Sequence, residues 1–134
     1  MEKLTFKIET RLINWNEVAQ MAYSKDSTKY SRTKKRQQTF IKHEIINQLA
    51  DIHNYFGSSK VSVAYKWYTS TKFDLGNLAA GEKFIADSIN ELKIWNDDFN
   101  IKKITHERIT SKNDYVQVTI SGKMTNDNKE TRSH

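Results

Sequence analysis

Four stretches of the chain alternate apolar and polar residues, which is the pattern of a half-buried β-strand. In the first stretch, Leu4, Phe6 and Ile8 are separated by polar side chains. The last two stretches are separated by the turn sequence Lys112-Asn113-Asp114 and are expected to pair as a hairpin. The expected strands are residues 3–12, 60–70, 101–110 and 115–121.

The segments between the strands predict three helices. Asn14 is a good helix cap, and a short helix is expected from there to Tyr23. Apolar residues at three- and four-residue spacing predict a long amphipathic helix from Thr33 to His53 and another over residues 75–92. Their predicted apolar faces are Phe40, Ile41, Ile45, Ile46, Leu49 and Ile52 in the first and Leu78, Ile85, Ile89 and Leu92 in the second. The order β-α-α-β-α-β-β predicts an α+β fold, with one mixed sheet and helices packed on it.

The chain's 134 residues are the length of one domain. We expect that domain to span residues 1–122 and to be followed by a polar, frayed tail at 123–134. The last three residues of the tail resemble the remnant of an expression tag and are left out of functional reasoning. No apolar run is long enough to span a membrane, and the first ten residues do not resemble a signal peptide. We therefore expect a soluble, intracellular protein with no membrane partner.

Several kinds of chemistry are excluded or disfavoured by composition. The absence of cysteine excludes disulfides and thiolate zinc sites. The four histidines show no metal-type spacing and are expected to be structural or surface residues. No pattern indicates a small-molecule cofactor. Trp15, Trp67 and Trp95 are expected to anchor the core or an interface between subunits.

Charge gives the first indication of a partner. The chain carries 22 Lys and Arg against 16 Asp and Glu, a formal net charge of +6, with a pI near 9.4. Such a balance is typical of nucleic-acid-binding proteins. Six cations fall within residues 25–36, and although a solvated loop explains a charge run in isolation, this density favours contact with DNA phosphates. The candidate DNA-binding residues are Lys25, Lys29, Arg32, Lys34, Lys35 and Arg36, with Lys102, Lys103 and Arg108 as a second surface.

Acidic residues surround the helix predicted at residues 75–92. Asp74 stands where a strand passes into this helix, and capping alone would explain it. Lys83 and Asp87 lie four residues apart on one side of the helix, as a surface ion pair would. Asp97 and Asp98 follow the helix and are common turn residues. Taken together they suit a Mg²⁺ ion, which carboxylates hold and which activates phosphodiester hydrolysis, with a lysine nearby to stabilise developing charge.

This stretch resembles the RusA family of phage and prophage Holliday-junction resolvases. The family signature is Asp-x-Asp-Asn-aliphatic, then a lysine and an aspartate on the helix, then an Asp-Asp pair. The matching residues are Asp74, Asn77, Leu78, Lys83, Asp87, Asp97 and Asp98. The match covers about twenty-five residues closely, and in element order it extends over nearly the whole domain.

The resemblance implies a homodimeric endonuclease that resolves four-way and branched DNA by paired, Mg²⁺-dependent cuts, with Mn²⁺ as a substitute ion. It implies roles in DNA recombination and repair in the cytoplasm of a bacterial host. The implied catalytic residues are Asp74, Lys83 and Asp98, with Asp97 as a further possible metal ligand and Asn77 and Asp87 as supporting residues.

The chain departs from the family at one position that matters. Gly76 stands where the family has its second aspartate, so one metal ligand is vacant. Three explanations are open: a deliberate substitution that traps an inactive protein, natural loss of activity with binding retained, or replacement of the ligand by Glu82. We favour the first, since glycine in the first turn of a helix is locally unfavourable. The alternative function is a branched-DNA-binding protein without catalysis, and a basic RNA- or protein-binding module ranks last.

Overall fold

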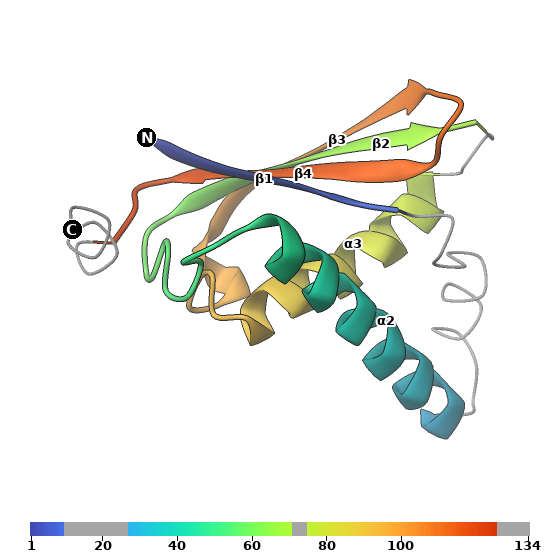
Figure 1. The fold of residues 1–134 in the computed structure, drawn as a ribbon, viewed down its shortest axis with the longest axis horizontal. Helices are drawn as coiled ribbons and strands as arrows, with labels where there is room; N and C mark the ends of the chain where they lie inside the picture. Colours follow the sequence, from blue (N-terminus) through green and yellow to red (C-terminus); the bar gives the residue numbers. More distant parts are fainter. Residues whose placement is uncertain (10–26, 71–74, 126–134) are drawn as a thin grey trace.

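The computed structural model consists of a four-stranded β-sheet with two helices packed on one of its faces (Figure 1). It describes residues 1–9, 27–70 and 75–125, and for residues 27–30, 75–80 and 98 it describes the backbone alone. The elements are β1 (Glu2–Ile8), α2 (Ser27–Gln48), β2 (Val61–Thr69), α3 (Leu75–Glu91), the 3₁₀ turn η2 (Asp98–Asn100), β3 (Ile101–Thr110) and β4 (Tyr115–Gly122). The predicted α+β class is confirmed, whereas the helix predicted at residues 14–23 and the residues after 9 of the first predicted strand lie outside the described residues.

The strand order corrects the predicted hairpin. The order in the sheet is β1-β4-β2-β3, so β2 separates β3 from β4. β4 runs antiparallel to both β1 and β2, and β3 runs parallel to β2. The connection from β3 to β4 crosses the end of β2, where the Ser111 amide donates to the Thr69 carbonyl at 3.0 Å and the Ser70 amide donates to the Asp114 carboxylate at 2.8 Å. Residues 111–114 reverse the direction of the chain, as predicted, but the two strands that they connect are separated by β2 and are not neighbours.

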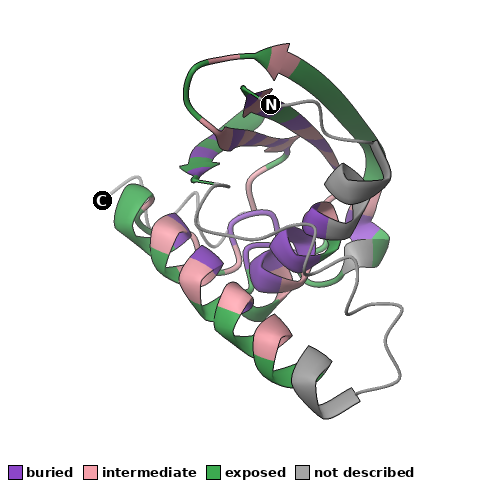
Figure 2. Cartoon of the chain, turned by 90° about the vertical axis from the view of Figure 1, so that its right-hand side faces the viewer, coloured by how far each residue is buried: buried purple, intermediate pink, exposed green. Residues whose placement is uncertain are grey.

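One face of the sheet packs against the helices and forms the core. Alternate residues of the three well-buried strands point into it, among them Phe6, Tyr65 and Val118. Ile41 and Ile45 of α2 and Ile85 and Ile89 of α3 supply the helical side. Figure 2 shows that the coloured part of α3 turns a largely buried side to the sheet, while α2 has an exposed side over residues 31–48.

The boundaries of α2 differ from the prediction. The helix begins at Ser27 instead of Thr33, because residues 27–36 contain good helix formers and neither glycine nor proline. It ends at Gln48, and Leu49 and Ile52 pack against the core from beyond its end. Ile46, predicted to be buried, is 54% exposed. Residues 27–36 of the basic segment therefore lie on a helix.

Two further features complete the core. Trp95 is fully buried, and its indole N–H donates to the side-chain carbonyl of Asn90. The start of the predicted tail is ordered, because the Thr125 amide and hydroxyl donate to the carbonyls of Tyr55 and Asn54 at 2.9 Å each, and Met124 packs against the core. Met124 and Thr125 therefore contact the rest of the domain, and residues 126–134 of the predicted tail lie outside the described residues. Neither α2 nor α3, the two helices of the described part of the chain, is long and apolar enough to cross a membrane.

Candidate nucleic-acid interface

A groove of about 420 Å³ lies between α3 and the start of β3. The β2-α3-β3 crossover places the helix over this part of the sheet, so two segments that are separate in sequence share the groove. Its charged lining residues are Glu82, Lys83 and Asp87 from α3 and Lys102 and Lys103 from β3. The structure thus brings Lys83, the helix lysine of the predicted site, into one groove with Lys102 and Lys103 of the second predicted DNA-binding surface.

Asp87 is engaged by α2. Its carboxylate lies 3.2 Å from the Lys34 ammonium and accepts a hydrogen bond from the Gln38 amide at 3.5 Å. The predicted surface pair of Asp87 with Lys83 is therefore replaced by a contact between the two helices. Because Lys34 neutralises Asp87, the three groove lysines are opposed by Glu82 alone among the charged lining residues. The groove is electropositive.

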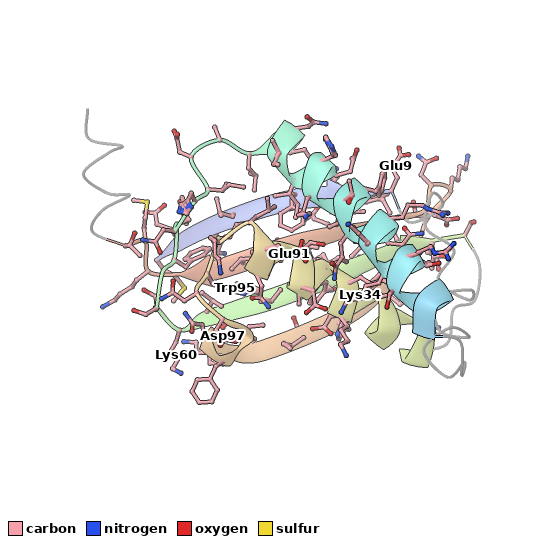
Figure 3. The ribbon with its side chains drawn as sticks, turned by 90° about the horizontal axis from the view of Figure 1, so that it is seen from below. Glu9, Lys34, Lys60, Glu91, Trp95 and Asp97 are labelled. Carbon is pink, nitrogen blue, oxygen red and sulfur yellow. The ribbon has the colours of Figure 1, made fainter. Side chains whose placement is uncertain are left out.

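The cations of α2 form a second positive surface. Arg32, Lys35 and Arg36 are exposed, and their three- and four-residue spacing places them on one side of the helix. Lys34 points away from this row toward α3 (Figure 3). Lys29 lies on the first turns of α2, where the backbone alone is described, and Lys25 lies outside the described residues.

The acidic positions of the predicted metal site are distributed along α3. Gly76 and Asn77 lie in its first turn, while Asp74 lies outside the described residues. Asp97 and Asp98 follow the opposite end of this 17-residue helix, which is about 25 Å long. Figure 3 shows Asp97 beside Lys60 at that end of the molecule. Within one chain, helix α3 therefore separates Gly76 from the acidic turn.

A metal site at these positions stays a prediction. The Asp97 carboxylate accepts a hydrogen bond from the Phe99 amide at 3.3 Å, and Asp98 is described by its backbone alone. Among the residues that the structure describes, no group of three or more histidine, aspartate or glutamate side chains is arranged to hold a metal ion. The described carboxylates of a single chain do not fit a Mg²⁺ site by themselves.

One feature near the groove was not predicted. The rings of Tyr65, Trp67 and His106 stack, with the Tyr65 and His106 centroids 4.9 Å apart. The Trp67 indole N–H donates to Nδ1 of His106 at 2.9 Å. Since Nδ1 accepts, this histidine is in its neutral form, and partial burial lowers its pKa below the ordinary 6.5. The parallel pairing of β2 with β3 places Tyr65 level with His106, and no sequence spacing indicates that pairing.

This stack predicts a pH-dependent stability. Because the folded state lowers the pKa of His106, the unfolded chain binds more protons near and below pH 6.5, and the free energy of unfolding falls as the pH drops through that value. Urea denaturation from about pH 7.5 to pH 5 measures the decrease. His106→Gln should remove part of it. Equal pH profiles for the natural chain and His106→Gln would contradict the assignment.

Comparison with known proteins gives no family. No protein-family model and no curated protein matches the chain. Among solved structures, it is similar to a chain of the HypE–HypF complex, with 10% identity and a TM-score of 0.33. The alignment covers 70% of this chain and 27% of that one. A likeness this weak supports no functional conclusion.

Proposed function

We propose that this chain binds four-way and branched DNA, and that it is a structure-selective, Mg²⁺-dependent endonuclease of the RusA kind whose cutting step is impaired by Gly76. The observation that carries the proposal is the electropositive groove between α3 and β3. Lys83, the lysine that the resemblance places near the scissile phosphate, lines it together with Lys102 and Lys103. A phosphodiester backbone is a ligand suited to such a groove.

The α2 cations extend the proposed DNA-binding surface. Helices α2 and α3 cover the same face of the sheet and are joined by the Lys34–Asp87 and Lys42–Glu91 ion pairs, at 3.2 and 2.6 Å. The helix that carries Arg32, Lys35 and Arg36 therefore packs against the helix that lines the groove. A rigid pair of cationic surfaces can contact more than one duplex arm, which is what selective binding of a branch requires.

The catalytic part of the proposal rests on the resemblance. By resemblance, Asp74 and an aspartate at position 76 would hold Mg²⁺, and Lys83 would contact the phosphate. Asp98, the third ligand that the resemblance implies, follows the opposite end of α3, so within one chain it lies apart from position 76. The ion would polarise the phosphodiester and activate water. Asn77 and Asp87 would support these groups, and Asp87 is held by Lys34 and Gln38. The alternative is a branched-DNA-binding protein without catalysis, which the glycine at position 76 favours.

The test compares binding to a synthetic four-way junction with binding to a linear duplex of the same sequence, in the absence of divalent ions. We expect tighter binding to the junction, by about tenfold or more, and a steep decrease of affinity with salt. Fluorescence anisotropy titrations at several salt concentrations measure both. Equal affinity for the two DNAs would contradict the proposal and favour a general nucleic-acid- or protein-binding module.

A further inference from the structure

The start of β3 contains an irregularity that shapes the groove between α3 and β3. The register of β2 and β3 shifts after Val61, so that Lys102 has no partner on β2. Ile101 is level with Val61 and Ile104 is level with Val63, and both valines are buried beneath the helices. Residues three apart on a regular strand point to opposite faces, but this bulge turns both isoleucines to the helix side. Both of them therefore line the groove.

The groove thus combines apolar side chains with cations. Ile104 is 44% exposed, and Ile101 and Ala86 are the other apolar lining residues. A DNA duplex presents sugars and phosphates on its outside and keeps the faces of its bases stacked inside, so apolar lining residues gain little from contact with it. Unpaired nucleotides present phosphates and free base faces together. The lining of the groove therefore suits an unpaired strand better than a duplex.

A largely exposed aromatic ring lies at the end of the groove where β3 begins. Phe99 is 82% exposed and precedes Ile101 by two residues, which span at most about 7 Å. The Lys60 ammonium lies over one face of the ring, 4.8 Å from its centroid, and donates to the Phe99 carbonyl at 3.5 Å. Because the side chain is so exposed, the other face of the ring is open to a ligand.

The turn that carries Phe99 is held by hydrogen bonds. The Phe99 amide donates to the Asp97 carboxylate at 3.3 Å, and the Asn100 amide donates to the Asp97 carbonyl at 3.0 Å. The buried side chain of Asn100 donates to the Gly57 carbonyl at 2.7 Å, which ties the turn to the loop before β2. Figure 3 shows Lys60 and Asp97 at this end of the molecule. A base that stacks on Phe99 would meet an ordered backbone, which lowers the entropic cost of binding.

We propose that the groove and Phe99 form a binding site for unpaired nucleotides, such as those of a strand that separates from its complement where the arms of a branched DNA meet. Phe99 stacks on one base, the two isoleucines contact the next, and the groove lysines bind the phosphates. Three lysines opposed by Glu82 alone favour a polyanion over an apolar peptide. The inference rests on the proposed function and narrows it, because the groove recognises the unpaired strand and the α2 row contacts the duplex arms.

Binding of single-stranded oligothymidylate tests the site directly. Phe99→Ala should weaken this binding by at least about fivefold, because a stacked base is lost, and should leave its salt dependence unchanged, because no phosphate contact is lost. Fluorescence anisotropy of a labelled oligonucleotide at several salt concentrations, without divalent ions, measures both. Ile46→Ala is the matched control, because it removes another exposed apolar side chain, on α2 and outside the groove. It should bind as the unsubstituted chain does.

Further substitutions separate the ring from apolar bulk and from charge. Phe99→Trp should keep or raise the affinity, whereas Phe99→Leu, which is apolar without a ring, should weaken it almost as far as Phe99→Ala. Replacing Lys102 and Lys103 by glutamine should make the slope of log affinity against log salt shallower by about 1.4, because each phosphate contact on a single strand contributes about 0.7. Ile104→Ser should weaken binding without changing the slope. Unchanged affinity in both Phe99→Ala and Ile104→Ser would overturn the proposal and favour a protein partner for these apolar residues.

A four-way junction with unpaired thymidines at the branch point connects the site to the proposed function. It should bind more tightly than a fully paired junction, and Phe99→Ala should remove that gain while the affinity for a linear duplex stays the same. If the chain does not prefer junctions but Phe99→Ala weakens oligothymidylate binding, the proposed function fails and the single-strand site stands. If the chain prefers junctions but Phe99→Ala changes neither junction nor oligothymidylate binding, the single-strand site alone is overturned.

Discussion

Gly76→Asp is expected to raise Mg²⁺-dependent cleavage of a four-way junction by at least about 100-fold over the chain with Gly76. Changes to groups that merely support a metal ligand cost about 10- to 100-fold, so restoration of a ligand should gain no less. The expected products are symmetric nicks in opposing strands. A gel assay with the four strands labelled in turn measures them.

The variant should also be stable. The first turn of α3 contains no acidic residue. An aspartate there replaces a poor helix former and interacts favourably with the helix dipole, so the melting temperature should stay the same or rise. A gain in cleavage can then be attributed to chemistry at position 76.

Two controls define the result. Gly76→Asn introduces a side chain of the same size without the charge and should give little cleavage. Asp74→Asn in the Gly76→Asp background should abolish the gained activity. If the double variant cuts as well as Gly76→Asp, the assignment of Asp74 is wrong. If Gly76→Asp does not cut but still binds the junction, the chain is a branched-DNA-binding protein.

Neutralising the exposed row of α2 should produce the second large effect. The triple substitution of Arg32, Lys35 and Arg36 by glutamine should weaken binding to the junction by on the order of 10²-fold near 0.1 M salt. The slope of log affinity against log salt should become shallower by about three, because three phosphate contacts are lost. Fluorescence anisotropy against salt concentration gives both values.

A matched control separates position from net charge. Lys3, Lys66 and Lys112 are exposed lysines away from the groove and from the α2 row, and their triple replacement by glutamine removes the same formal charge. It should weaken binding only slightly. If both triple variants lose the same affinity, DNA binding depends on the net charge of the protein, and the α2 surface has no special role.

β1, β2 and β4 were predictable from the sequence because each has one buried face, whereas β3 is exposed along most of its length. Alternation placed β2, β3 and β4 within one or two residues of their observed ends. Their neighbours in the sheet were not predictable, since the turn at 111–114 suits a hairpin as well as a crossing over β2. The order follows from the pairing of β4 with both β1 and β2, and hydrogen bonds to the Thr69 carbonyl and from the Ser70 amide hold the connection across the end of β2; no local pattern reveals either.

The candidate site was predictable in part for a similar reason. Lys83 was identified by the family resemblance, and Lys102 and Lys103 by their charge, but the crossover that brings the three into one groove is a property of the fold. The partner of Asp87 was missed because Lys34 is more than fifty residues away in sequence and the two meet only when α2 packs against α3. Gly76 and Asp97 are separated by the length of α3. The sequence alone did not predict this separation, because it does not give the direction that the chain takes after the helix.

The position of β4 has a consequence for how the protein is made. β4 is the last strand of the described chain, yet it lies between β1 and β2 and provides the only strand partner of β1 among the described residues. β1 is therefore synthesised more than a hundred residues before its partner strand β4. Until Gly122 has left the exit tunnel, β1 lacks its strand partner while β2 and β3 can already pair with each other, and completion of the sheet should depend on long-range contacts that form late.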